Sequence, residues 1–254
     1  MRAMRRALAL AFLLISSLPA AAIVGGAGAP PGEIARSVVL IVGSRGNSCS
    51  GAALAHDLVL TAAHCVLPGA DYKIVEFDAA RQPHLRDVAS VTAHPKFDLQ
   101  TMLAHRATAD VALIKLAVPL ASMEPATLGP ALTVAPGDAL TIVGYGVSVR
   151  GDGKSGGTLR AATLVATGKP GTLQIRLFDP ATKGEHPGLG ACTGDSGAPA
   201  FATDGSPTIV GVVSWSTGPG NSAGCGGLTG VTPLFLYRGW ITQTVKILRN
   251  QIRS

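Results

Sequence analysis

Short runs of apolar residues, many of them β-branched, recur along most of the chain and predict a fold built from strands. Gly, Pro, Asn or Asp residues separate the runs, and this punctuation is typical of the short strands of a sandwich or a barrel. The clearest runs are Val38–Val42, Leu58–Thr61, Lys73–Phe77, Val111–Leu116, Leu140–Gly144 and Ile209–Ser214. Near the C-terminus the spacing changes, and apolar residues at positions 237, 241, 245 and 248 predict a helix over about 237–249.

The first 22 residues have the three parts of a secretory signal peptide. A basic start, Met1–Arg6, precedes an apolar stretch, Ala7–Ile15, and small residues follow as far as Ala22. A membrane anchor is the alternative, but a helix needs about 20 apolar residues to span a bilayer, and this stretch is shorter. We therefore expect a soluble, exported product of residues 23–254, secreted or periplasmic, with no membrane attachment once the signal is removed.

The formal net charge of +6 falls to +3 when the three arginines of the signal peptide are removed. The remaining Lys and Arg residues are scattered and form no basic stripe, and only 4% of all residues are aromatic. The sequence therefore gives little support to a nucleic-acid-binding role.

Residues 194–197 read Gly-Asp-Ser-Gly, and they are the most informative stretch of the chain. Glycine tolerates the tight backbone that presents a serine hydroxyl while aiming backbone N–H groups at one point. A nucleophile beside an oxyanion hole requires that arrangement. For this tetrapeptide taken alone, a surface turn capped by Asp195 is the alternative.

A histidine and an aspartate in distinctive settings support the catalytic interpretation. His64 follows the apolar run that ends at Thr61 and directly precedes Cys65, and Asp110 directly precedes the run 111–116. The order His, Asp, Ser along the chain is one of the known orders of a catalytic triad. Asp98 is the competing aspartate, although no apolar strand follows it, and the other five histidines are at positions 56, 84, 94, 105 and 186.

Together with Ile-Val-Gly-Gly at positions 23–26, these motifs resemble those of the chymotrypsin/trypsin-like serine endopeptidases, and the resemblance extends from Ile23 to the C-terminus. It implies an all-β fold of two six-stranded antiparallel Greek-key β-barrels with a C-terminal helix. The first barrel would cover about residues 23–125 and the second about 126–240, with the Pro-rich stretch 119–136 crossing between them. The cleft between the barrels would hold the active site.

The resemblance implies a role for each residue of the predicted triad. Ser196 would be the nucleophile, His64 the general base and then the general acid, and Asp110 the residue that orients the imidazole. The backbone N–H groups of Gly194 and Ser196 would form the oxyanion hole.

The specificity pocket departs most from the family pattern. Gly190 occupies the position at the pocket floor where trypsin-like members carry Asp, and Ser216 and Gly230 match the walls. Without a carboxylate, a buried cationic side chain would be unpaired and costly, so we expect cleavage after uncharged residues, large apolar ones above all. Ser216 stands in place of the usual Gly, and Ala198 is a second departure of the same kind.

Two further segments match the family. Ser214, Trp215 and Ser216 match the backbone that pairs with an extended substrate, although an ordinary strand end is the alternative for them. Ile23 would become the amino terminus and form an ion pair with a buried Asp195. Because small residues precede Ile23, removal of the signal peptide would itself create this terminus without a separate propeptide.

Four cysteines suit an oxidising compartment, and by themselves they allow three pairings. The resemblance selects Cys49–Cys65 and Cys192–Cys225. A zinc site is the alternative, but no pair has the close spacing that is usual in such sites. The acidic residues near position 77 also lack a convincing ligand spacing, so we expect neither a metal nor a cofactor.

The sequence therefore predicts a secreted serine-type endopeptidase, a hydrolase that forms an acyl-enzyme. Its partners would be polypeptide substrates and protein protease inhibitors, and it would act as a monomer. A pseudo-protease that only binds is the second hypothesis, although such relatives lose His, Asp or Ser and this chain keeps all three. A hydrolase with a nucleophile elbow is disfavoured, because residues 194–197 do not read Gly-x-Ser-x-Gly.

Overall fold

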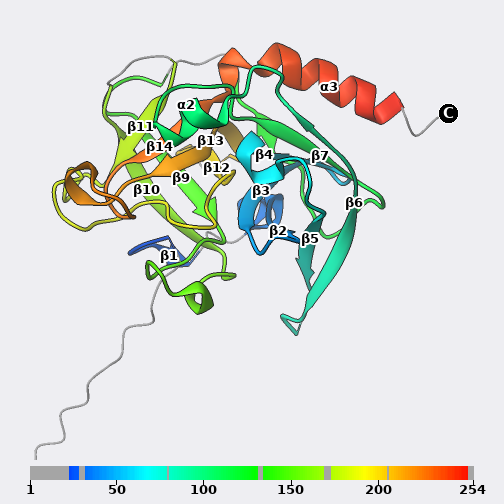
Figure 1. Ribbon diagram of the computed structural model, residues 1–254, viewed down its shortest axis with the longest axis horizontal. Coiled ribbons are helices and arrows are strands. Elements are labelled where there is room, and N and C mark those ends of the chain that lie inside the picture. The colour runs from blue at the N-terminus through cyan, green and yellow to red at the C-terminus, as the bar shows by residue number, and fades with distance from the viewer. Residues whose placement is uncertain are drawn as a thin grey trace, which may run out of the picture.

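Two antiparallel β-barrels stand side by side in the computed structural model, one in blue to green and the other in green to orange (Figure 1). The structure describes residues 23–28, 32–78, 80–130, 134–168, 173–204 and 206–250. The expected signal peptide, residues 1–22, lies outside the described residues.

The first barrel closes in the strand order β2-β3-β4-β7-β6-β5, and every pairing in it is antiparallel. Its strands are β2 (Val38–Gly43), β3 (Ser48–Ala55), β4 (Leu58–Thr61), β5 (Tyr72–Phe77), β6 (Pro83–Ala93) and β7 (Ala112–Leu116). Closure leaves no open edge along the ring, which is how a small β-domain avoids exposing an unpaired strand.

The second barrel follows the order β10-β11-β14-β13-β12-β9 and closes through the pairing of β9 with β10. Its strands are β9 (Ala139–Gly144), β10 (Arg160–Ala166), β11 (Ile175–Phe178), β12 (Pro199–Ala202), β13 (Thr208–Ser216) and β14 (Thr229–Pro233). Two short strands join it, β1 (Ala27–Gly28) on β10 and β8 (Thr127–Leu128) on β13. The N-terminal strand β1, which the expected boundary placed with the first barrel, therefore pairs with the second.

Several strands are apolar on both faces, because one face lines a barrel and the other packs between the barrels. In β4, Val59 belongs to the core of the first barrel, whereas Leu58 and Leu60 share a cluster with Phe201 and Val212 of the second. Successive side chains of a strand point to opposite faces. This arrangement explains why the predicted strands read as continuous apolar runs rather than as alternating ones.

The helical segments are short except for the last one. They are α1 (Glu33–Ser37), η1 (Ala63–Val66), α2 (Leu99–Leu103), η2 (Gly153–Ser155), η3 (Pro219–Asn221), η4 (Leu234–Leu236) and α3 (Arg238–Asn250). The helix α3, red in Figure 1, buries Ile241 and Leu248 in the cluster between the barrels. Its bounds agree with the predicted 237–249. Within the described ranges, no helix is long and apolar enough to cross a bilayer.

Two disulfides staple the segments that carry the candidate chemistry. Cys49–Cys65 joins β3 to η1, and Cys192–Cys225 joins the loop before β12 to the loop before β14. These are the pairs that the resemblance implied. In the chain-entropy model, loops of this size contribute about 3–4 kcal/mol each to stability.

Candidate active site

Strand pairing brings His64 and Asp110 together. β4 pairs with β7 in a register that sets Thr61 opposite Ala112. His64 lies three residues beyond Thr61, in η1, and Asp110 lies two residues before Ala112, so both reach the same end of the strand pair. His64 Nδ1 lies 2.8 Å from Asp110 Oδ2, and the His64 backbone N–H donates to Asp110 Oδ1 at 3.0 Å.

Asp110 is fully buried, and its third hydrogen bond crosses from the other barrel. The Ser214 hydroxyl donates to Asp110 Oδ2 at 2.5 Å. A buried carboxylate with this many donors is held in one orientation. Two effects raise the pKa of the nearby Tyr237 phenol: burial, which is the larger, and the negative charge of Asp110.

The loop between Cys192 and β12 carries Gly-Asp-Ser-Gly and lies directly on the first barrel. Gly194 has a φ of 94° and Gly197 a φ of 77°, in the region that favours glycine. A Cβ on Gly197 would collide with the Thr61 hydroxyl and the Ser50 carbonyl. The Ser50 N–H donates to the Ser196 carbonyl at 2.8 Å. Ser50 is buried in β3 and directly follows Cys49. The loop of residues 193–198, named the nucleophile loop for the predicted role of Ser196, therefore packs beside the Cys49–Cys65 disulfide.

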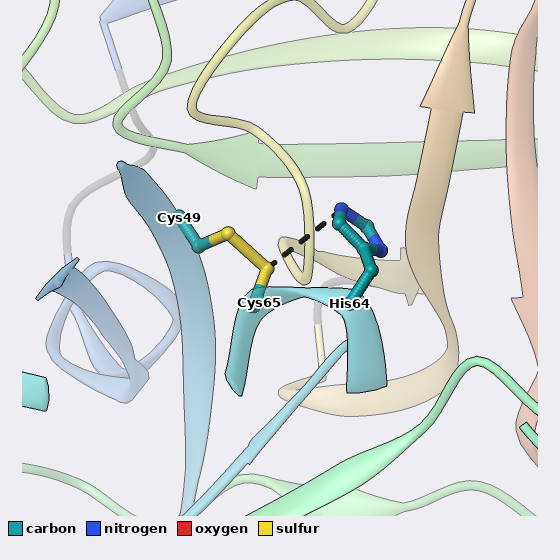
Figure 2. Close-up of side chains that lie close together, drawn as sticks. All are labelled: Cys49, His64 and Cys65. Carbon is teal, nitrogen blue, oxygen red and sulfur yellow. Dashed lines mark hydrogen bonds between the residues drawn. A yellow bond between two sulfur atoms is a disulfide. The ribbon is translucent and has the colours of Figure 1, made fainter. Parts of the chain in front are cut away.

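Ser196 and His64 lie in this one region without a hydrogen bond between them. Among the described residues, the Ser196 hydroxyl makes no hydrogen bond, and His64 Nε2 lies 3.9 Å from Cys65 Sγ. Figure 2 shows the imidazole beside the disulfide, with that contact dashed. Catalytic hydrogen bonds are often long or misaligned in the absence of substrate, and the partnership of Ser196 with His64 stays a prediction.

The same three side chains look like a metal-binding cluster on distance alone. Ligand atoms of Cys49, His64 and Cys65 lie within 4.8 Å of one another. Both sulfurs are joined in a disulfide, however, and zinc needs thiolates. This cluster therefore offers no cation site.

Asp195 is buried without an opposite charge. Its carboxylate accepts the backbone N–H groups of Gly146 at 2.8 Å and Cys192 at 2.9 Å, and no cationic group of the described residues reaches it. Burial raises the pKa of Asp195 from 3.8 to about 7, although both hydrogen bonds lower it. Ile23 is also fully buried and shares a core cluster with Ala191. Ala191 precedes Asp195 by four residues in the chain. The predicted ion pair between Ile23 and Asp195 stays a prediction.

The segment 214–216 has a free edge next to Asp110. β12 pairs with β13 only as far as Val212. Val213 makes the last hydrogen bonds on that side, where its N–H donates to the Ala198 carbonyl and its carbonyl accepts the Gly197 N–H. Beyond it, β14 is the only pairing partner of the segment among the described residues, with a bulge between Val213 and Trp215. An unpaired strand edge of this kind can accept an extended peptide.

Two other side chains lie over the face of the Trp215 ring, and no sequence pattern indicated these contacts. The His105 imidazole stacks on it with centroids 4.6 Å apart, and the Arg176 guanidinium lies 5.6 Å from the ring. A Cβ on Gly230 would collide with the indole ring. Trp215 is only 7% exposed, and its indole N–H is buried with no partner among the described residues. His105 was one of five unremarkable histidines, so no local signal marked it.

Of the residues predicted for the specificity pocket, Ser216 and Gly230 lie in the neighbouring strands β13 and β14, and Gly190 lies outside the strands. Gly230 pairs with Trp215, and Ser216, whose hydroxyl donates to the Gly224 carbonyl at 3.3 Å, is the next residue along β13. A Cβ on Gly190 would lie 3.2 Å from Gly226 Cα. The backbone of Gly226 therefore leaves little space for a side chain on residue 190 itself.

The competing candidates have structural roles. Asp98 caps α2, accepting the Thr101 N–H at 2.6 Å. His94 packs against Tyr237 and Trp240, and burial lowers the pKa of His94. These contacts account for both side chains without catalysis.

Comparison with known proteins agrees with this geometry. The family model described as Trypsin matches residues 23–241. A trypsin of Phaedon cochleariae is 30% identical over 218 residues, covering 78% of this chain and 79% of that protein. The vitellin-degrading protease of Bombyx mori is 29% identical over 219 residues, covering 80% of this chain and 78% of that protein.

Solved structures share the fold at low identity. Human heparin binding protein superimposes with a TM-score of 0.67 at 23% identity, over 88% of this chain and 97% of that one. Neuropsin, a serine protease expressed in mouse brain, gives a TM-score of 0.65 at 21% identity, over 85% of this chain and 97% of that one. With the family model matched from Ile23 to Ile241, the chain belongs to the trypsin-like serine proteases and is a serine-type endopeptidase.

Proposed function

We propose that the protein hydrolyses polypeptides through an acyl-enzyme in which Ser196 is the nucleophile. The observation that carries the proposal is the hydrogen-bonded set His64, Asp110 and Ser214, assembled from both barrels beside the loop that holds Ser196. A serine hydroxyl is a weak nucleophile until a base removes its proton, and an oriented imidazole is suited to that task.

In this mechanism the proton moves between Ser196, His64 and the leaving amine. His64 Nε2 takes the proton of the attacking hydroxyl, while Asp110 holds Nδ1–H and stabilises the imidazolium. The backbone N–H groups of Gly194 and Ser196 bind the oxyanion of the tetrahedral intermediate, and among the described residues neither N–H has another partner. His64 then protonates the departing amine. In the second half of the reaction, a water molecule gives a proton to His64 and attacks the acyl-enzyme, and the carboxylic acid leaves Ser196.

The substrate lies along the free edge of residues 214–216 as an added strand. Main-chain hydrogen bonds to that edge supply affinity, and the pocket beside Gly190 selects the side chain before the scissile bond. Gly190 gives no carboxylate to pair with Lys or Arg, so the enzyme prefers uncharged residues there, large apolar ones above all.

The protein acts in an oxidising compartment, either secreted or periplasmic. It acts there as a monomer. The two disulfides support that setting, because such bonds persist where thiols are not kept reduced. Protein inhibitors that present an extended segment would occupy the same edge of residues 214–216.

Labelling and mutation test the proposal against a pseudo-protease. An organophosphorus fluoride should modify Ser196 in the wild-type protein and leave Ser196→Ala unmodified. Ser196→Ala and His64→Ala should each abolish nearly all activity, and the double variant should be little worse, because triad members act as a unit. Losses that multiply, or a wild-type protein that resists the reagent, would contradict the assignment.

A panel of chromogenic peptides ending in Phe, Leu, Ala or Arg tests the specificity in the same preparation. Phe and Leu peptides should be the best substrates. A clear preference for Arg would overturn the role of Gly190 while leaving the peptidase function intact.

A further inference from the structure

Ser50 is fully buried at the contact between the first barrel and the nucleophile loop. It lies in β3 directly after Cys49, whose disulfide partner Cys65 follows His64. Its carbonyl accepts the Thr61 hydroxyl at 2.8 Å, which fixes the residue within its own barrel. Ser50 takes no part in the proposed proton transfers between Ser196, His64 and the leaving amine.

The remaining polar groups of Ser50 all reach the second barrel. Its N–H donates to the Ser196 carbonyl at 2.8 Å, and its hydroxyl donates to the Gly194 carbonyl at 2.9 Å. The same hydroxyl accepts the Tyr145 N–H at 3.0 Å. A serine hydroxyl can donate and accept at once, and this one does both between two buried backbone groups.

These bonds constrain the peptide units around the two predicted oxyanion donors. The Thr193 carbonyl accepts the Val147 N–H at 2.8 Å, which fixes the unit that carries the Gly194 N–H. The next unit is held at its carbonyl by the Ser50 hydroxyl and at its N–H by the Cys192 carbonyl. The Ser196 carbonyl is held by the Ser50 N–H. Ser50 therefore contacts the loop on both sides of the unit that carries the Ser196 N–H.

The loop needs such external support because glycine is its least restricted residue. Gly194 has a φ of 94°, where rotation of the neighbouring peptide units meets little steric resistance. Donors that stabilise a developing charge are effective when they are already aimed before the reaction begins. A hydrogen bond to the Gly194 carbonyl selects one orientation of the loop.

We propose that the Ser50 hydroxyl is a positioning group for the oxyanion hole. It does not touch the substrate, and it acts by holding Gly194 and Ser196 so that their N–H groups converge. This inference rests on the proposed peptidase function of the same site.

The first test compares two buried serines. Ser50→Ala removes the hydroxyl that bonds Gly194. Ser37→Ala is the matched control, because Ser37 is equally buried and its hydroxyl donates to the Ile34 carbonyl at 2.9 Å, remote from the loop. The processed wild-type enzyme and both variants are titrated with an organophosphorus reagent, and kcat is expressed per reactive site. Removing an oxyanion donor outright costs about 10²–10³ in rate, so the loss of a positioning group should lower kcat by about 10- to 100-fold.

The division between kcat and KM separates positioning from general loosening. Ser50→Ala should keep its KM within about threefold while a peptide boronate, which places an oxygen in the oxyanion hole, loses affinity by the same factor as kcat. Ser50→Gly also lacks the hydroxyl and should show the same kcat deficit, although its stability will differ. Ser37→Ala should keep kcat and boronate affinity even where its melting temperature falls.

Several outcomes would overturn the inference. An unchanged kcat in both Ser50 variants, or an equal kcat loss in Ser37→Ala, would remove the positioning role and leave the peptidase function standing. Failure of both Ser50 variants to fold would make Ser50 a purely structural residue. An inactive wild-type protein would overturn the proposed function together with this one.

Discussion

Two fully buried aspartates, Asp110 and Asp195, differ in what surrounds their charge. Asp110 accepts three hydrogen bonds, two from His64 and one from Ser214, and its imidazole partner can itself become a cation. Asp195 accepts only two backbone N–H groups, and burial raises its pKa to about 7. A buried carboxylate without an opposite charge is costly. Asp195 therefore lacks a partner that Asp110 already has.

The difference leads to separate proposed roles for the two aspartates. In the proposed mechanism, Asp110 stabilises the charge that arises when His64 takes a proton. For Asp195 we propose a permanent cation as the partner, and the chain offers Ile23, which is fully buried in the same core cluster as Ala191. An amino group freed at Ile23 would supply that cation.

The largest effect is expected at Asp110. Asp110→Asn keeps the shape of the side chain but lets His64 take the wrong tautomer, and the expected loss in kcat is about 10⁴-fold. Activity per titrated site on a Phe peptide measures it. Asp98→Asn is the control, because Asp98 caps a short helix, and it should keep full activity. A loss of similar size in Asp98→Asn would reverse the choice between them.

The second prediction concerns stability against pH in a form whose chain continues upstream of Ile23. The Asp195 carboxyl keeps its proton up to about pH 7 when folded but loses it near pH 4 when unfolded. The free energy of unfolding should therefore fall as pH rises from about 4 to 7, by about 4 kcal/mol in total, and stay low above pH 7.

Urea unfolding across that pH range measures the slope, in a Ser196→Ala background that prevents self-digestion. Asp195→Asn should remove the slope, whatever its own stability. The processed form, beginning at Ile23, should lack the slope as well, because the ammonium favours the ionised carboxylate. Identical pH profiles for the extended and processed forms would show that Ile23 and Asp195 do not pair.

The third prediction is the corresponding effect on activity. Losing one partner of a buried ion pair costs about 3–5 kcal/mol, which lowers the active fraction by about 10²–10³-fold or more. A cytoplasmically made form that begins before Ile23 should show that deficit and recover when trimmed to Ile23. Mass spectrometry of the exported protein should find Ile23 first. Full activity in the extended form would contradict the mechanism, and a mature terminus well upstream would indicate a separate propeptide.

Most of the fold was predictable because its physical cause is local or periodic. The apolar runs predicted β2, β4, β5, β7, β9 and β13, and the helical spacing predicted α3, within a few residues. The motifs around His64, Asp110 and Ser196 were equally readable, because each combines a special residue with a distinctive flanking strand or turn. The resemblance that they carry also gave the pairing of the four cysteines.

Other contacts between distant segments were not predictable. Ser50 follows a cysteine in an ordinary strand, and His105 follows a short helix, yet one holds the nucleophile loop and the other covers Trp215. The N-terminal strand β1 pairs with β10, more than a hundred residues away, which no local pattern indicates.

The sequence by itself determined which residues are the candidates for chemistry and which segments become strands, because side-chain type and periodicity act within a few residues. Only the tertiary structure decided which backbone groups hold the loop around Gly194, what covers Trp215, and that Asp195 is buried without a cation among the described residues. Those outcomes depend on closing two barrels and pressing them together. The closure sets distances between residues that the chain separates by up to about a hundred and fifty positions, as it does for Ser50 and Gly194.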